Sequence, residues 1–159
     1  MVKIACIAQL VNVIAPIMTE KGGRAWRQTI FHPLHLASRY GRGRALNLNV
    51  EVPAYDSTLG DGIPYLDIAA VEGTDGTVAL FAVSRHQTEA MTVEVALHGF
   101  DAKRVLDHQE IRNDSLRAVN TADRPEAVAP RKGTGAAIEG GVLKLTLAPL
   151  SYAMIRVGA

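Results

Sequence analysis

The amino-acid sequence predicts a mainly β protein, in which an antiparallel sandwich or barrel follows one strand and one helix. From about residue 45 onward, short segments with alternating apolar and polar residues recur, and Gly- and Pro-rich turns separate them. The first 43 residues instead hold one apolar run and one segment with helical spacing. We therefore divide the chain into residues 1–43 and residues 44–159.

The chain starts with a short apolar run, residues 3–8, which ends at the polar Gln9. A run of this kind is typical of a strand that is buried on both faces of a parallel sheet. It would bury Cys6 and would place Gln9 at the carboxyl end of the strand, where α/β barrels and doubly wound sheets bind their ligands. A parallel strand needs neighbours, and no second strand–helix unit follows in the sequence, so the chain looks truncated.

A helix is predicted over residues 24–40, where apolar residues recur at helical spacing until Gly41. We interpret Trp26, at the start of this helix, as a core anchor rather than a platform for a sugar ring. His32 and His35 could share a metal ion in principle. The intervening Pro33 and the lack of a third ligand argue against a metal site.

The second part of the chain shows strand periodicity. The expected strands cover residues 46–52, 65–71, 78–84, 91–97, 103–111, 142–147 and 152–157. The pair Asp75-Gly76 predicts a tight hairpin between the second and third of these strands. Residues 56–64 are rich in turn-forming residues, and residues 120–135 are expected to form a surface loop.

Composition excludes several classes of function. Lys and Arg number 17 against 16 Asp and Glu, a net charge of +1, so neither nucleic acid nor an anionic membrane surface is an expected partner. A single cysteine cannot form an internal disulfide, which fits a reducing compartment. The apolar run that begins at Ile4 is interrupted by Gln9, Asn12 and Pro16, and it is too short to span a bilayer.

Specific stretches of the sequence resemble a known enzyme family. AQLVNVIAPIMTE at residues 8–20 and GGRAWRQTIF at residues 22–31 resemble the last barrel strand and helix of the glycoside hydrolase family 51 α-L-arabinofuranosidases. LFAVSR at residues 80–85 and LAPLSYAMIR at residues 147–156 resemble the β-sandwich that closes those enzymes. The resemblance implies that residues 1–43 are the terminal βα unit of a truncated (β/α)8 barrel and that residues 44–159 are a jelly-roll-like C-terminal β-sandwich.

The resemblance also implies an activity. The family hydrolyses terminal α-L-arabinofuranosides of arabinan and arabinoxylan oligosaccharides with retention, using two glutamates on barrel strands that precede Gln9, and needs no metal or cofactor. Both glutamates would lie upstream of this chain, so we expect no catalytic residue here and no activity from the chain alone. The one residue carried over is Gln9, whose amide would bind the sugar hydroxyls. The resemblance further implies a cytoplasmic homo-oligomer.

Two alternatives stay open beside this interpretation. The chain could be a non-catalytic carbohydrate-binding module, although an aromatic content of 5% argues against one, or an oligomerisation module. Asn12 could face the same pocket as Gln9, but we expect it to satisfy backbone groups of its loop. We interpret five acidic residues as solvated surface residues rather than catalytic ones: Glu20, Glu51, Asp56, Asp61 and Glu110.

Overall fold

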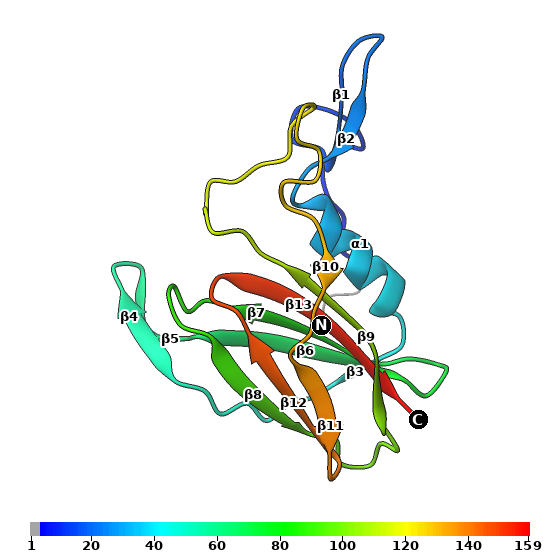
Figure 1. Cartoon of the computed structure of the whole chain (residues 1–159), viewed down its shortest axis with the longest axis vertical. Helices are drawn as coiled ribbons and strands as arrows, with labels where there is room; N and C mark the ends of the chain where they lie inside the picture. The colour runs from blue at the N-terminus through cyan, green and yellow to red at the C-terminus, as the bar shows by residue number, and fades with distance from the viewer. Residues whose placement is uncertain (1–3) are drawn as a thin grey trace.

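The structure is a computed structural model that describes residues 4–159, and it confirms a mainly β fold (Figure 1). Two antiparallel sheets pack face to face as a sandwich. The larger sheet has the strand order β10-β9-β13-β7-β6-β3, and the smaller sheet has the order β11-β12-β8. In chain order the strands of both sheets are β3 (Arg44–Leu46), β6 (Leu66–Glu72), β7 (Val78–Ser84), β8 (Met91–Ala96), β9 (Arg104–Ile111), β10 (Arg131–Lys132), β11 (Ala136–Glu139), β12 (Val142–Leu147) and β13 (Ser151–Gly158).

The main hydrophobic core lies between the two sheets. Alternate residues of each strand point inward, as the period of two requires. Leu80 on β7 and Ile155 on β13 meet Leu143 and Leu145 on β12, and all four are almost fully buried. Burial of each such side chain stabilises the fold by roughly 1.5–3 kcal/mol.

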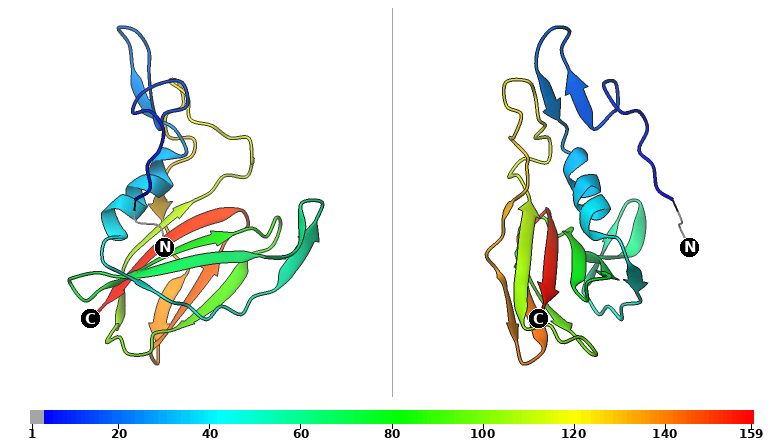
Figure 2. Two further views of the ribbon diagram at one scale, coloured as in Figure 1. Left: turned by 180° about the vertical axis from the view of Figure 1, so that it is seen from behind. Right: turned by 90° about the vertical axis from the view of Figure 1, so that its right-hand side faces the viewer.

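A second cluster lies on the outer face of the larger sheet, beneath α1 (Phe31–Tyr40), the one helix of residues 4–159. Figure 2 shows α1 on one side of the sandwich and the smaller sheet on the other. Leu36 of the helix packs in the same cluster as Ile111, Val128 and Met154. Because Met154 faces the helix and Ile155 faces the other sheet, β13 is covered on both faces.

Two small hairpins complete the fold. Strands β1 (Ile17–Thr19) and β2 (Ala25–Arg27) pair with each other just before the helix. Strands β4 (Ala54–Ser57) and β5 (Gly60–Pro64) form an arm that projects from the sandwich (Figure 1). The tip residue of that arm, Leu59, is exposed.

The strand expected at residues 3–8 is corrected by the structure. Lys3 lies outside the described residues, and residues 4–8 are exposed and take part in no β-pairing. Cys6, expected to be buried, is exposed as well. The physical reason is that a strand exists only through hydrogen bonds to a neighbour, and the described part of the chain supplies none to this segment.

The start of the predicted helix is also wrong. Residues 25–27 form β2, and the helix begins at Phe31. Pro33 explains the difference, because a helix that started at residue 24 would place this proline in its interior at a cost of about 3 kcal/mol. In the observed helix Pro33 occupies the first turn, where a missing N–H is tolerated. At the other end, the Gly41 N–H bonds to the Ala37 carbonyl at 2.8 Å, as the predicted terminus requires.

Most of the expected sandwich strands are confirmed to within one residue at each end. The β6–β7 hairpin is confirmed too: the Gly73 N–H donates to the Thr77 carbonyl at 2.8 Å, and Gly76 adopts a φ of 76°. The exception is the strand expected at residues 46–52, since β3 ends at Leu46. The loop expected at residues 120–135 contains β10 and is partly buried.

No helix in residues 4–159 is long and apolar enough to cross a membrane.

Candidate functional site

The candidate substrate-binding residue, Gln9, lies at the end of the unpaired segment and is exposed. Its backbone has a φ of 58°, and Asn12 and Val13 have values of 64° and 58°. This left-handed conformation is unfavourable for side chains other than glycine, most of all for the β-branched Val13. Strained backbone of this kind is concentrated at functional sites.

The turn after Gln9 is held by one side chain, that of Asn12. The Thr19 N–H donates to Asn12 Oδ1 at 2.7 Å, and Asn12 Nδ2 donates to Thr19 Oγ1 at 2.9 Å. The Asn12 N–H bonds to the Ile17 carbonyl at 2.8 Å and closes the turn. Asn12 therefore forms hydrogen bonds with groups of its own loop, as we expected from the sequence. These bonds hold the loop that follows Gln9 in one conformation.

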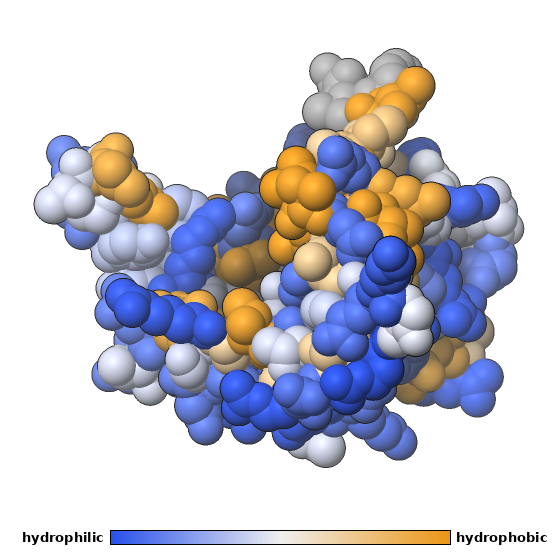
Figure 3. All heavy atoms as spheres, turned by 90° about the horizontal axis from the view of Figure 1, so that it is seen from above, coloured by the Kyte–Doolittle hydropathy of each residue, from blue (hydrophilic) through white to orange (hydrophobic). Residues whose placement is uncertain are grey.

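Exposed apolar side chains are frequent in the segment that contains Gln9 and in the helix segment. Figure 3 shows hydrophobic side chains exposed on one face of the molecule, with hydrophilic ones between them. The exposed apolar residues before β1 and on the helix segment are Ile4, Ile7, Leu10, Val11, Val13, Ile14, Ile30 and Leu34. The apolar residues of the helix thus divide between two sides: Leu36 packs on the sheet, while Leu34 faces away from it. Large exposed apolar side chains in such number are typical of an interface.

A buried amide ties this region to the sandwich. Asn120 is only 2% exposed, and its Nδ2 donates to the carbonyl oxygens of Arg27 and Val128, both at 2.9 Å. The Val128 N–H returns a bond to Asn120 Oδ1 at 2.8 Å, and Trp26 Nε1 donates to the Asn120 carbonyl at 3.2 Å. Trp26 belongs to β2 rather than to the helix, is half-buried and lies in neither of the hydrophobic clusters of the described residues, so it is held by this hydrogen bond and is not the expected core anchor. Sequence reasoning missed Asn120, because nothing near it distinguishes it from other polar loop residues.

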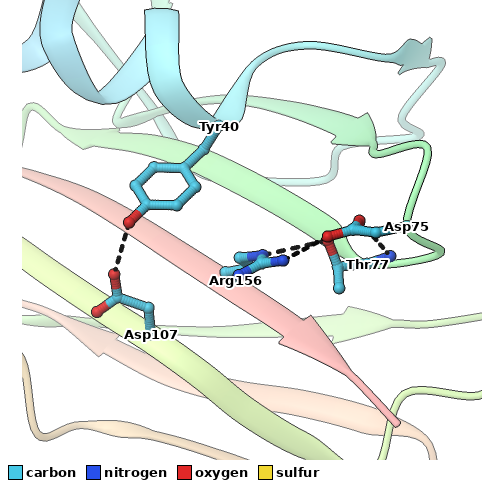
Figure 4. A network of polar contacts seen from close by, with 5 residues as sticks. All are labelled: Tyr40, Asp75, Thr77, Asp107 and Arg156. Carbon is cyan, nitrogen blue, oxygen red and sulfur yellow. Dashed lines mark hydrogen bonds and ion pairs between the residues drawn. The ribbon is translucent and has the colours of Figure 1, made fainter.

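A second polar network fixes the carboxyl end of the helix (Figure 4). The Tyr40 hydroxyl donates to Asp107 Oδ2 on β9 at 3.3 Å. Beside it, Arg156 of β13 donates to Asp75 and to Thr77 Oγ1, which lie in the β6–β7 hairpin and at its end. Hydrogen bonds from Thr77, together with Arg156, lower the pKa of Asp75 to about 2.

The two helix histidines lie beside a cavity of about 310 Å³ between the helix and the loop that precedes β10. His32 is buried, and its Nε2 has no hydrogen-bond partner in the described residues. Burial lowers the pKa of His32, and the nearby positive charges of Arg27 and His35 lower it further. Within residues 4–159, no group of three or more His, Cys, Asp or Glu side chains is arranged to hold a metal ion.

The five acidic residues interpreted as surface residues lie at the surface of the structure or partly exposed to it. Glu20, Glu51, Asp56 and Asp61 are exposed, and Glu110 is half-buried with Arg112 Nε 3.8 Å from its carboxylate.

Fold and site together define an accessory β-sandwich that carries a short N-terminal appendage with an exposed apolar surface. Residues 1–151 match the family of α-L-arabinofuranosidase C-terminal domains, and the chain belongs to this family.

Similar proteins agree with this assignment. The chain is 47% identical over 158 residues to an intracellular exo-α-(1→5)-L-arabinofuranosidase of Halalkalibacterium halodurans and 42% identical over 157 residues to one of Bacillus subtilis. These alignments cover 99% and 98% of this chain but 31% of each relative, so the chain spans less than a third of their length. A family 51 α-L-arabinofuranosidase of Bifidobacterium longum superposes with a TM-score of 0.85 at 34% identity, over 94% of this chain and 30% of that structure.

Proposed function

We propose that this chain is the C-terminal part of a retaining α-L-arabinofuranosidase that removes terminal arabinofuranose from arabinan or arabinoxylan oligosaccharides. The observation that carries the proposal is the segment of residues 4–10. It is mostly apolar, exposed and unpaired, and it carries Gln9 beside a turn with strained backbone. Such a segment is what a barrel strand becomes when the strands on either side of it are not supplied.

In this proposal residues 1–43 are the last βα unit of the barrel, and residues 44–159 are the sandwich that closes it. The exposed Leu34 and Ile30 of the helix segment would then face the rest of the barrel. Asn120 and Tyr40 would hold the helix on the sandwich from the opposite side. Residue 43 therefore divides the two parts along the sequence only. In space they are joined, because α1 packs on the larger sheet of the sandwich.

Gln9 is the residue that we propose binds substrate. An amide side chain offers both donors and an acceptor, which suits a ring with several hydroxyl groups. Retaining hydrolysis requires two carboxyl groups about 5–5.5 Å apart, one as nucleophile and one as acid and then base. We propose that both are glutamates on earlier strands of the longer enzyme, so Gln9 orients the sugar while those residues react.

The setting of the enzyme follows as part of the same proposal. The names of the two relatives above describe intracellular enzymes, which favours the cytoplasm. Assembly of the enzyme into a homo-oligomer is part of the same proposal and rests on the family resemblance alone. The reaction itself needs no metal ion or cofactor, because two carboxyl groups suffice for it.

An interaction module remains the second candidate function, and the same exposed apolar surface favours it. A chimera distinguishes the two functions. In it, residues 1–159 replace the part of the H. halodurans enzyme that aligns with them, 31% of its length. We expect the purified chain alone to show no turnover of 4-nitrophenyl α-L-arabinofuranoside and the chimera to be active. Turnover by the chain alone, or a folded chimera without activity, would contradict the proposal.

A further inference from the structure

The cavity of about 310 Å³ between α1 and the loop before β10 is lined by several basic side chains. Arg27 of β2 and Arg39 of α1 line it together with His32 and His35, and Glu126 of the loop is the one acidic residue of the lining. Its volume lies at the lower end of the range for small-molecule sites, about 300–1,000 Å³. The cavity can therefore hold a small organic molecule, and its charge favours an anion.

Two guanidinium groups of this lining are positioned by aromatic rings. The guanidinium carbon of Arg27 lies 5.1 Å from the centre of the Phe31 ring. That of Arg39 lies 5.4 Å from the centre of the Tyr40 ring, whose hydroxyl is bonded to Asp107 (Figure 4). Contact with a ring face holds a guanidinium group without using its five N–H donors. The donors of both arginines therefore stay available to a ligand.

Neither arginine has a carboxylate partner in the part of the chain that the structure describes. No ion pair of residues 4–159 includes Arg27 or Arg39, whereas Arg85 pairs with Asp67 at 2.8 Å. Arginine keeps its charge at any physiological pH. A guanidinium group binds a carboxylate or a phosphate through two parallel hydrogen bonds. Two such groups on one cavity thus favour a ligand that carries an oxoanion.

His32 provides a second observation that points to a ligand. Its side chain is 6% exposed and lines the same cavity, yet its Nε2 forms no hydrogen bond within residues 4–159. Buried polar atoms without a partner are exceptional in proteins, and they accompany bound ions or catalytic roles. The charges of Arg27 and His35 oppose protonation of this ring and, after burial, lower its pKa. An anion in the cavity would offset the repulsion between these groups.

Glu126 is the one group of the lining that opposes an anion. Its side chain is exposed, and of the charges that act on the pKa of His32 its effect is the smallest. With both histidines neutral, two arginines against one glutamate leave the cavity with a net positive charge. Glu126 therefore weakens the attraction for an anion without cancelling it.

We propose that this cavity binds a small organic oxoanion, either a phosphate monoester or a carboxylate, through the guanidinium groups of Arg27 and Arg39. The organic part of the ligand would fill the remaining volume between the helix and the loop. The proposal does not depend on the proposed function, because it rests only on side chains of this chain and on their charges.

Nuclear magnetic resonance of the histidine rings tests the site, because His32 and His35 line the cavity while His86 and His98 line other parts of the surface. The probes are glucose 6-phosphate, glucuronate and, as the neutral molecule of similar size, glucose. We expect the resonances of His32 and His35 to shift with at least one of the two anions, with a Kd below about 1 mM, and not with glucose. The anion that binds more tightly identifies the acidic group of the ligand.

Substitutions in the lining separate this site from general attraction of anions to the surface. Arg27→Gln and Arg39→Gln should each weaken binding by about tenfold or more, because each removes hydrogen bonds to a charged group. Arg42→Gln is the matched control: it removes an exposed arginine just after the same helix that does not line the cavity, and binding should not change. Glu126→Gln should tighten binding by about two- to fivefold, since it removes the one like charge. Thermal unfolding shows that each variant is folded.

Two results from the chain would overturn the proposal. One is the absence of any shift of the His32 resonance with both anions at concentrations up to about 10 mM. The other is a loss of affinity in Arg42→Gln as large as that in Arg39→Gln.

The chimera with the H. halodurans enzyme tests the same cavity in a longer protein. Equilibrium dialysis with the tighter anion should show binding that Arg39→Gln weakens by about tenfold or more. Equal binding by the chimera and its Arg39→Gln variant would also overturn the proposal. Hydrolytic activity of the chimera is measured separately, so a failure of the proposed function is distinguished from a failure of this site.

Discussion

Asn120 and Arg27 are joined by a hydrogen bond from the side-chain amide to the main-chain carbonyl, at 2.9 Å and across 93 positions of sequence. The same amide group also bonds the two main-chain groups of Val128. One buried side chain therefore connects the N-terminal appendage, the loop before β10 and, through that loop, the sheet.

Asn120→Ala should destabilise the chain by about 2–4 kcal/mol, because it leaves buried main-chain donors and acceptors without partners. Urea unfolding followed by the fluorescence of Trp26, the only tryptophan, measures the effect at the point of contact. The exposed Asn49→Ala serves as the matched control and should change stability by less than about 0.5 kcal/mol. Equal effects of the two substitutions would show that Asn120 does not connect these segments.

Tyr40→Phe removes only the hydroxyl that donates to Asp107, so we expect a loss of about 0.5–1.5 kcal/mol. Tyr40→Ala also removes the ring that packs against the second hydrophobic cluster, and it should cost about 3–5 kcal/mol. The two values come from thermal or chemical unfolding of the purified variants. If both variants lost the same stability, the helix would be held by the hydrogen bond alone.

Gly43→Ala should destabilise the fold by at least about 3 kcal/mol. Gly43 has a φ of 148°, and a Cβ at this position would collide with the main-chain oxygen of Glu72 where β3 meets β6. Gly62→Ala is the control: its φ is 66°, but the space around its Cβ is open, so only about 1–2 kcal/mol should be lost. A smaller effect at Gly43 than at Gly62 would contradict the close approach of these strands.

Stability should fall as the pH is lowered below about 6.5, the pKa of an unfolded histidine. Burial lowers the pKa values of His32 and His108 in the folded chain, so the unfolded state takes up protons first and is favoured as acid is added. His32→Leu should flatten this dependence between about pH 6.5 and the folded pKa, as measured by urea unfolding at a series of pH values. An unchanged slope would show that His32 is not kept neutral by its surroundings.

The sequence predicted the sandwich strands well where the alternating pattern and the flanking turn residues indicate the same strand ends. Residues 78–84 and 142–147 alternate and are bounded by Asp75-Gly76 and Gly140-Gly141, and the structure has strands at these same positions. The hairpin β4–β5 was missed because its residues read as turns. It is held by side-chain bonds such as that from the Gly62 N–H to Asp56 Oδ1, which periodicity does not reveal.

The appendage was harder to predict, for two different reasons. At Pro33 a local rule was available, because a proline fixes how far upstream a helix can extend. At residues 4–8 no local rule suffices, since an apolar segment forms a strand only beside a partner, and the described chain offers it none. The candidate site shares this limit: Gln9 is proposed from the sequence, and the groups that would surround it belong to the rest of the proposed enzyme.

The role of Gln9 is tested most directly by steady-state kinetics of the chimera with the H. halodurans enzyme. Gln9→Ala should lower kcat/KM for 4-nitrophenyl α-L-arabinofuranoside by about 10–100-fold, the value of one or two hydrogen bonds to the sugar. The exposed Asn49→Ala in the same chimera should leave kcat/KM unchanged. A Gln9→Ala chimera with the full kcat/KM of its parent would contradict the account.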